Sequence, residues 1–288
     1  MTFEILQPGL KVINTIAALK SLLEPLRSAQ QKIALVPTMG ALHKGHLSLI
    51  KAAQQQAEIV VCSIFVNPTQ FTDPKDLERY PRPLDHDLAM LGEAGCDVVF
   101  MPAVQEMYPV QESWHIDLGP AELLLEGAFR KGHYQGVTQI VKKLFDAVMP
   151  DLAFFGQKDF QQVLMINTMV AQFNLPITIV TCPIIREEDG LAMSSRNIHL
   201  SAADRQNALV LNQALTVVSD KFDVAHIKEL EAEGRNIIMA KPGVELDYFV
   251  IVDGDTLTEA ENPEHRTLVA LVAAKVGETR LIDNMILG

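Results

Sequence analysis

Cysteine is scarce in this chain: Cys62, Cys96 and Cys182 are the three among 288 residues. An odd and scattered set of this kind excludes a disulfide framework and a cysteine-built metal cluster. Each cysteine lies in or beside an apolar run. We therefore expect three buried thiols in a reducing compartment.

Long apolar segments and an excess of basic charge are also missing. No stretch approaches the roughly 20 apolar residues that a membrane span needs, and the first residues lack the basic and apolar parts of a secretory signal. Lysine and arginine number 24 against 36 acidic residues, for a net charge of −12. A broad nucleic-acid surface requires a basic patch. We therefore expect a cytoplasmic protein with neither a membrane nor a nucleic-acid partner.

What the sequence does contain is a strand-to-helix turn with two histidines. Residues 33–36 form a short apolar run typical of a buried parallel strand, and helical spacing of apolar residues begins at Leu47. Between them, Gly40 and Gly45 permit unusual backbone angles and a close approach by a ligand. The free N–H groups and the dipole at a helix N-terminus favour phosphate.

The histidines of this turn, His43 and His46, follow the pattern His-x-Gly-His. Imidazole groups at a helix N-terminus can donate to phosphoryl oxygens whose charge grows in a transition state. The alternatives are a metal-binding pair or two unrelated surface histidines, and no nearby Cys/His cluster supplies the further ligands that a metal needs. The position between a buried strand and a helix favours nucleotide phosphate binding.

A second apolar run, residues 59–66, ends in Asn67-Pro68-Thr69-Gln70. Strand, helix and strand at this spacing indicate a right-handed βαβ unit, in which ligands lie beyond the carboxyl ends of the strands. Asn67 and Gln70 would then share a rim with the two histidines, and amides suit a small polar acid or amine. The alternative, that Asn67-Pro68 only makes a turn, stays open.

Further patterns extend this fold to a Rossmann-like α/β domain over residues 1–183. They are a helix at residues 15–30 interrupted near Pro25, a helix at 83–94, a helix at 137–148, and buried strands at 98–101, 152–155 and 177–180. Residues 126–136 form an irregular glycine-rich stretch that can cover a site as a lid or can simply be a loop. Residues 184–288 read as a smaller α+β domain, with helices at 203–218 and 224–239 and strands at 246–252, 267–274 and 279–282.

Two more stretches are suited to phosphate. Lys158 follows a strand and a glycine and opens the helix predicted at residues 159–173, where Asp159 can equally serve as a cap. Ser194, Ser195 and Arg196 form a hydroxyl-rich loop whose arginine can fork onto a polyphosphate. The alternative for that loop is a helix N-cap with a surface arginine.

Residues 37–46, 65–71, 80–82, 156–162, 189–197 and 279–284, in this order, resemble the pantothenate synthetase (pantoate–β-alanine ligase) family of the His-x-Gly-His nucleotidylyltransferase superfamily. The resemblance implies a two-step reaction. ATP and (R)-pantoate give pantoyl adenylate and pyrophosphate with Mg²⁺, and β-alanine then gives pantothenate and AMP. It also implies a homodimer and a small domain that closes over the ATP site.

The resemblance assigns roles residue by residue. Gln70 would contact pantoate and β-alanine, Gln162 pantoate, and Asp87 is a candidate Mg²⁺ ligand. His46, the expected proton donor, His43, Lys158 and Arg196 would carry the catalysis. The implied ATP-binding set is Met39, Gly40, Ala41, Leu42, His43, Lys44, Gly45, His46, Gly156, Gln157, Lys158, Asp159, Ile185, Met193, Ser194, Ser195 and Arg196.

Four positions depart from the family's usual pattern: Lys131, Tyr134, Gln157 and His86, the last in a stretch that is often acidic. Three other functions remain as alternatives. A nucleotidylyltransferase would transfer AMP to a phosphorylated acceptor, and an aminoacyl-tRNA synthetase shares the His-x-Gly-His logic but needs room for tRNA recognition. A regulatory module would bind ATP without releasing pyrophosphate.

Overall fold

The computed structural model describes residues 4–7, 9–72, 74–260 and 263–288. The chain divides into two compact units. Unit 1 comprises Met1–Glu122, Glu126–Gly156 and Gln162–Cys182, and unit 2 comprises Leu123–Leu125, Gln157–Gln161 and Pro183–Gly288. The short strand-end segment Gln157–Gln161 thus packs with the C-terminal part of the chain.

Unit 1 is built on a seven-stranded sheet with the strand order β1-β2-β5-β4-β3-β6-β7. The strands are β1 (Glu4–Gln7), β2 (Leu10–Ile13), β3 (Ile33–Thr38), β4 (Ile59–Ile64), β5 (Val98–Phe100), β6 (Leu152–Gly156) and β7 (Thr178–Cys182). All neighbours pair in parallel except β1, which is antiparallel to β2. The α/β fold expected from the sequence is therefore confirmed.

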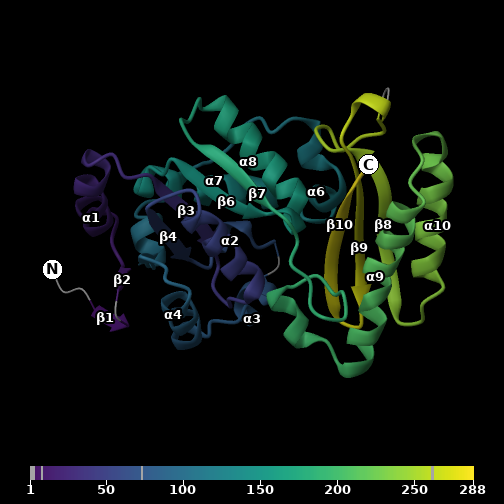
Figure 1. Ribbon diagram of the computed structural model, residues 1–288, viewed down its shortest axis with the longest axis horizontal. Coiled ribbons are helices and arrows are strands. Elements are labelled where there is room, and N and C mark those ends of the chain that lie inside the picture. Colours follow the sequence, from purple (N-terminus) through teal and green to yellow (C-terminus); the bar gives the residue numbers. More distant parts are fainter. Residues whose placement is uncertain (1–3, 8, 73, 261–262) are drawn as a thin grey trace. The chain divides into compact units, whose positions relative to one another are not determined.

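The central strands are buried because helices cover the sheet (Figure 1). The helices of this unit are α1 (Ile16–Ser28), α2 (Lys44–Gln54), α3 (Pro74–Arg79), α4 (Leu84–Glu93), α5 (Val104–Met107), α6 (Leu125–Phe129), α7 (His133–Val148) and α8 (Phe160–Gln172). Residues such as Leu35, Val61 and Val99 are fully buried, as side chains in a sheet with both faces covered must be.

Two expectations for unit 1 are wrong. Helix α1 is not interrupted at Pro25 but runs three residues further, to Ser28. Its fully buried Leu19 and Leu23, and a 2.8 Å hydrogen bond from Arg27 Nη2 to the carbonyl of Val148, hold it against the sheet domain. These contacts offset the backbone hydrogen bond that proline cannot make.

The glycine-rich stretch 126–136 is likewise not an irregular loop. It contains α6 and the first turn of α7, joined by a short turn in which Gly132 adopts φ 78°. Gly136 lies inside α7, where a Cβ atom would overlap the carbonyl oxygen of Thr69 and lie 2.7 Å from Cα of Gln70. This glycine is there to allow close packing, not to break the helix.

Unit 2 contains a three-stranded antiparallel sheet in the order β10-β9-β8. Its strands are β8 (Val244–Asp253), β9 (Leu268–Val276) and β10 (Thr279–Leu287), and its long helices are α9 (Ala202–Asp220) and α10 (Ile227–Met239). The central strand β9 supplies the fully buried Val269, Ala270 and Val272. The predicted α+β character is confirmed, although each strand runs further than expected.

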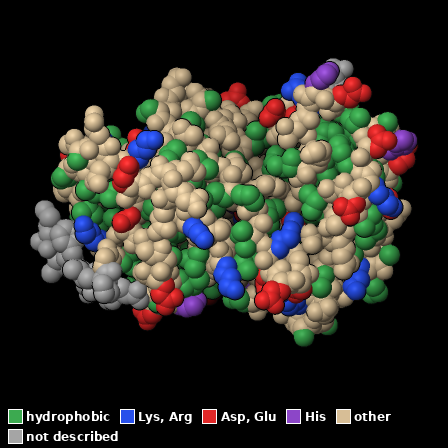
Figure 2. All heavy atoms as spheres, in the orientation of Figure 1, with side chains coloured by type: hydrophobic (Ala, Val, Ile, Leu, Met, Phe, Trp, Pro, Cys, Tyr) green, Lys and Arg blue, Asp and Glu red, His purple; other side chains and the backbone are tan. Residues whose placement is uncertain are grey.

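The three cysteines, the helices and the surface charges agree with the composition of the chain. Cys62, Cys96 and Cys182 are buried free thiols, as expected. Burial raises the pKa of Cys96 to about 12, so this thiol is unreactive at neutral pH. None of the helices in the described ranges combines the length and the hydropathy of a membrane span. On the face shown in Figure 2, lysine and arginine side chains are interspersed with acidic ones, a pattern typical of a solvated surface.

Candidate functional site

The strand-to-helix turn of unit 1 is held by a buried carboxylate. After β3, the hydroxyl of Thr38 accepts a hydrogen bond from the Gly40 N–H at 3.1 Å. The next two N–H groups, of Ala41 and Leu42, donate to the two oxygens of Asp87 at 2.8 and 2.7 Å. Asp87 comes from α4 and is only 1% exposed. A side chain distant in sequence thus organises this turn.

The backbone of the turn explains its glycine. Gly40 has φ 78° and Ala41 has φ 51°, so two successive residues are left-handed. A Cβ atom on Gly40 would lie 2.9 Å from Oδ2 of Asp87, closer than carbon and oxygen tolerate. Glycine is therefore required at position 40, whereas Ala41 accepts a conformation that costs an alanine about 1 kcal/mol.

The two histidines lie side by side at the start of α2, with ring centroids 4.1 Å apart. Nδ1 of His43 accepts a hydrogen bond from the Gly45 N–H at 3.1 Å, and Nδ1 of His46 accepts one from the His43 N–H at 3.3 Å. An imidazole whose Nδ1 is an acceptor carries its proton on Nε2. Both rings are therefore fixed as Nε2–H donors.

These contacts modify one expectation about the turn. The N–H groups of residues 40–43 and Gly45, which the sequence suggested for phosphate binding, donate instead to acceptors within the protein. Phosphate contacts from this turn would then come mainly from the imidazoles and from other side chains such as Lys44, which is exposed.

The candidate metal ligand Asp87 has a structural explanation. Burial raises the pKa of its carboxyl group, and the hydrogen bonds from Leu42 and Ala41 oppose that shift. Among the described residues, no three His, Cys, Asp or Glu side chains converge in a group that could hold a metal ion. The described ranges therefore contain no such cluster around Asp87, and the assignment of Asp87 as a Mg²⁺ ligand stays a prediction.

Asn67 and Gln70 lie on the rim next to this turn. Both are buried, at 1% and 8% exposure, and Nε2 of Gln70 lies 3.0 Å from Sδ of Met39. The ends of β3 and β4 therefore meet as the βαβ pattern predicted. The turn interpretation of Asn67 is also correct, because its Oδ1 accepts a 3.4 Å hydrogen bond from the Thr69 N–H.

A cavity of about 900 Å³ opens on this part of unit 1, and Met39, Gly40, Pro68 and Asp87 contribute to its wall. Gln162 belongs to the same unit, in the first turn of α8, and is half-buried. No hydrogen bond ties its side chain to another described residue, so its expected contact with pantoate stays a prediction.

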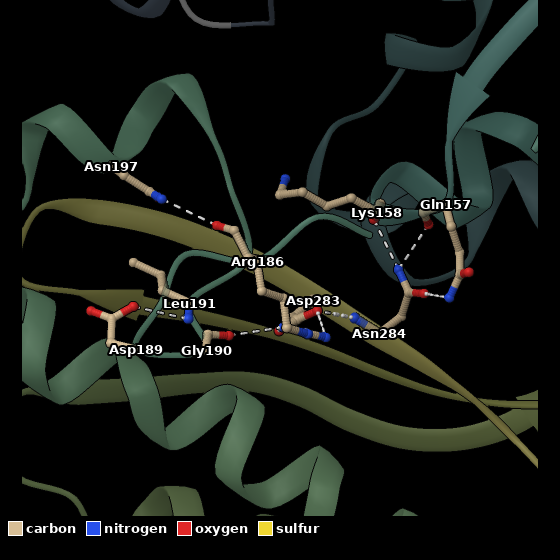
Figure 3. Close-up of polar contacts among 10 residues, drawn as sticks. Gln157, Lys158, Arg186, Asp189, Gly190, Leu191, Asn197, Asp283 and Asn284 are labelled. Atoms are coloured by element: carbon tan, nitrogen blue, oxygen red, sulfur yellow. Dashed lines mark hydrogen bonds and ion pairs between the residues drawn. The ribbon is translucent and has the colours of Figure 1, made fainter. Parts of the chain in front are cut away.

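In unit 2, the segment around Lys158 is held by a buried amide from β10. Asn284, 1% exposed, donates from Nδ2 to the carbonyl oxygens of Gln157 and Lys158, both at 3.0 Å. Its Oδ1 accepts a 3.0 Å hydrogen bond from Nε2 of Gln157. Figure 3 shows the Lys158 side chain extending away from these contacts. Its ammonium group has no partner among the described residues. It is therefore available to bind an anion.

Gly156 and Asp159 flank the Gln157–Lys158 pair, as the sequence predicted. Gly156 is the last residue of β6 and pairs with Cys182. Asp159 is exposed and ends the short 3₁₀ turn η3 (Gln157–Asp159), so the following helix begins at Phe160.

A second anchor in unit 2 is the ion pair between Arg186 and Asp283. It is bidentate, with N–O distances of 2.6 and 3.0 Å, and Asp283 is 4% exposed. Arg186 also donates to the carbonyl of Gly190 at 3.2 Å, as Figure 3 shows. The sequence interpretation missed the roles of Arg186, Asp283 and Asn284, although the motif at residues 279–284 contains the last two.

The predicted polyphosphate loop has the geometry of its alternative. Ser194 caps η4 (Ser195–His199) by accepting a 3.3 Å hydrogen bond from the Arg196 N–H. Ile185 and Met193 are joined by a 3.0 Å backbone hydrogen bond that closes the loop. The N-cap part of that alternative is therefore confirmed, whereas Arg196 is half-buried rather than at the surface. A role for the Ser194, Ser195 and Arg196 side chains in phosphate binding stays a prediction.

Asn197 and Glu187 tie this loop to α9. Nδ2 of Asn197 donates to Glu187 at 2.9 Å, and Arg205 forms ion pairs with both Glu187 and Asp189 at 2.8 Å. The hydrogen bond from Arg205 holds the pKa of Glu187 below its usual value. Oδ1 of Asn197 is the one buried side-chain polar atom without a partner in the part of the chain that the structure describes.

Comparison with known proteins places this geometry in a family. The model of the pantoate–β-alanine ligase family matches residues 11–286. A pantothenate synthetase of Bacteroides thetaiotaomicron is 48% identical over 278 residues, with 96% of this chain and 98% of the relative covered. One of Moorella thermoacetica is 47% identical over 281 residues, with 96% and 99% covered.

Solved structures agree. A pantothenate synthetase crystal structure from Thermus thermophilus matches with a TM-score of 0.87 at 40% identity, covering 95% of this chain and 98% of that one. A pantoate–β-alanine ligase from Francisella tularensis, described as complexed with β,γ-ATP and β-alanine, matches with a TM-score of 0.76 at 34% identity, covering 96% and 97%. With a parallel-sheet unit, a paired-histidine turn and relatives matched along nearly their whole length, this chain belongs to the pantoate–β-alanine ligase family.

Proposed function

We propose that this chain catalyses the ATP-dependent condensation of (R)-pantoate with β-alanine, giving pantothenate, AMP and pyrophosphate through a pantoyl adenylate. Family membership across residues 11–286 supports the reaction class, and the Francisella tularensis relative is described with an ATP compound and β-alanine. The observation that carries the proposal in this chain is the pair of Nε2–H imidazoles at the start of α2, in a turn whose Met39 contacts the buried amide of Gln70.

The first step needs charge neutralisation. A pantoate carboxylate oxygen attacks the α-phosphorus of ATP, the bond from that phosphorus to the bridging oxygen breaks, and pyrophosphate leaves with its electron pair. His43 and His46 can donate from Nε2 to the phosphoryl oxygens as their charge grows. In unit 2, Lys158 and Arg196 are the cations that we assign to the same nucleotide.

The second step transfers the pantoyl group to an amine. The neutral amino group of β-alanine attacks the carbonyl carbon of the mixed anhydride, an amide bond forms, the bond to the AMP oxygen breaks, and the nitrogen loses a proton. Positioning is the main requirement, because the adenylate is already an activated acyl donor. No acyl-enzyme is needed, so the buried thiols take no part.

Mg²⁺ is best treated as part of the nucleotide substrate. Mg²⁺ keeps several waters and is usually bound through phosphates with one or two carboxylates. That mode suits a chain whose described residues form no metal-binding cluster. The homodimeric state and closure of the small domain remain predictions that come from the family resemblance.

The test offers the protein ATP with and without pantoate, and with and without β-alanine, and follows pyrophosphate and pantothenate. We expect pyrophosphate release only with pantoate, a single turnover or slow release without β-alanine, and pantothenate only with all three substrates. Release that is equal without pantoate would contradict the proposal. Release that requires a phosphorylated acceptor instead would favour a nucleotidylyltransferase.

A further inference from the structure

The amide of Asn67 has an orientation that two backbone groups define. Its Oδ1 faces the N–H of Thr69 at 3.4 Å, and its Nδ2 faces the carbonyl oxygen of Gly136 at 3.0 Å. A backbone N–H can only donate and a carbonyl oxygen can only accept. The oxygen and nitrogen ends of the Asn67 amide are therefore distinguished by chemistry, which settles an assignment that side-chain shape alone does not.

This orientation sets the polarity of Gln70. Nδ2 of Asn67 also donates to Oε1 of Gln70, at 3.2 Å, so the acceptor end of the Gln70 amide is occupied. Nε2 then points to the other side, where Sδ of Met39 lies 3.0 Å away. A thioether sulfur is a weak acceptor. Gln70 thus presents an N–H donor, which is suited to a carboxylate, carbonyl or hydroxyl oxygen of a substrate.

The backbone of Gln70 is fixed independently of its side chain. Nδ1 of His133 lies 2.7 Å from the Gln70 carbonyl oxygen, and Gly136 of α7 packs against the same turn without a Cβ atom between them. Rotation of the side-chain amide is therefore the main freedom left to Gln70, and Asn67 controls it.

Tyr108 completes the arrangement from a segment that follows α5. Its hydroxyl lies 2.8 Å from Oδ1 of Asn67 and must donate, because that oxygen is an acceptor. This is the shortest of the contacts to Oδ1, since the Thr69 N–H and hydroxyl lie at 3.4 and 3.2 Å. The Tyr108 ring packs near Phe65, with centroids 6.3 Å apart, and Lys143 Nζ lies 5.0 Å from its centroid. Burial raises the pKa of Tyr108, which keeps the hydroxyl protonated.

We propose that Tyr108 is a positioning residue for substrate binding: its hydroxyl holds the Asn67 amide, and Asn67 holds Gln70 so that Nε2–H faces the oxygen of the acid substrate. The inference rests on the proposed function for the identity of that substrate, pantoate. Tyr108 reaches Gln70 only through Asn67, so its hydroxyl need not touch the reacting atoms.

The test uses Tyr108→Phe, which removes one oxygen and keeps the ring in its packing. Loss of one positioning hydrogen bond predicts a rise of about five- to tenfold in KM for pantoate, with kcat and KM for ATP changed less than about twofold. Tyr248→Phe, the same change on β8 of unit 2, is the matched control and should leave KM for pantoate unchanged. An unchanged KM in Tyr108→Phe would overturn the proposal.

A double-mutant cycle shows whether Tyr108 acts through Gln70. In a Gln70→Ala background, Tyr108→Phe should add no further rise in KM for pantoate, whereas independent effects would multiply. If the rises in KM of the two single variants multiply in the double variant, Tyr108 does not act through Gln70 and the proposal is rejected.

A readout without turnover separates this inference from the proposed function. In ¹⁵N-labelled protein, Tyr108→Phe should shift the side-chain amide signals of both Asn67 and Gln70, assigned with Asn67→Asp and Gln70→Glu. Unshifted signals would overturn the inference even in an active enzyme. Shifted signals in a protein that makes no pantothenate would support it while the proposed function failed.

Discussion

The turn at residues 38–46 in unit 1 and the segment at residues 185–199 in unit 2 are held in different ways. The turn is held by backbone N–H groups that donate to Asp87, a carboxylate 1% exposed. The segment depends largely on Arg205 and Glu187, whose side chains are 31% and 30% exposed. Its Arg186–Asp283 pair and the buried side chains of Leu191 and Ala192 reach into the interior.

This difference predicts different responses to change. A buried donor that loses its acceptor costs about 1–3 kcal/mol and is little affected by salt. An exposed ion pair contributes about 0–1 kcal/mol and weakens as salt or acid is added. The turn should therefore behave as a rigid part of the fold, and the segment as a part whose order depends on solution conditions.

The largest effect is expected where a donor is removed from the turn, at His46, or from the strand-end segment of unit 2 at Lys158. His46→Asn keeps an acceptor for the His43 N–H but removes the imidazole, and Lys158→Ala removes the ammonium group. Each should lower the rate of pyrophosphate release by about 10²–10³-fold, the usual cost of losing one donor to a developing charge. Single-turnover kinetics would measure it. Lys221→Ala, at an exposed ion pair in unit 2, is the control, and wild-type rates in either variant would remove that residue from the mechanism.

A smaller effect, on folding, is expected from Asp87→Ala. It leaves the N–H groups of Ala41 and Leu42 buried without an acceptor, which should lower the free energy of unfolding by roughly 2–4 kcal/mol. Asp85→Ala, in the same helical turn but exposed, should change it by less than about 1 kcal/mol. Denaturant titrations with Mg²⁺ and with a chelator measure both.

The Mg²⁺ dependence decides between the two roles of Asp87. A loss of stability that is the same with and without Mg²⁺ identifies a structural acceptor. A loss seen only with Mg²⁺ present would instead support Asp87 as a metal ligand and contradict the structural account.

The smallest effect is a pH dependence in unit 2. The pKa of Glu187 is lower in the folded protein, because Arg205 stabilises the carboxylate. Its contribution is therefore fully present above the unfolded pKa, near 4.5, and is lost as the pH falls through the lower folded pKa. Glu187→Gln should remove up to about 1 kcal/mol at neutral pH.

The same variant should flatten the acid limb of the stability curve, measured by urea unfolding between about pH 3 and pH 7. Glu188→Gln, at the exposed neighbouring residue, should leave the curve unchanged. If Glu187→Gln and wild type lose stability in parallel over this range, the ion pair with Arg205 contributes nothing measurable.

The elements that could be predicted are those with strong local patterns. Strand β3 and helix α2 follow from an apolar run and a helical period on either side of a glycine turn, and β4 and β6 are apolar runs of the same kind. Strand β2 was missed because four residues carry little periodicity, and its identity depends on pairing with β5. Gly136 suggested a loop, but its reason is a contact with Thr69 that no local pattern reveals.

The candidate site shows the same division. His43, His46, Asn67 and Gln70 could be identified because each follows the end of a predicted strand, where parallel sheets bind ligands. Asn284 and Tyr108 could not be given roles, because each acts on residues far along the chain, at separations of 127 residues from Gln157 and 41 from Asn67.

By itself, the sequence determined the parallel sheet, the family and the turn that presents two imidazoles, because apolar period, glycine position and motif order are local properties of the chain. The tertiary structure alone decided which end of the Gln70 amide faces away from Asn67, and that Asp87 binds the backbone N–H groups of the turn. Hydrogen-bond direction depends on partners brought together by folding, and the spacing of residues along the chain does not encode it.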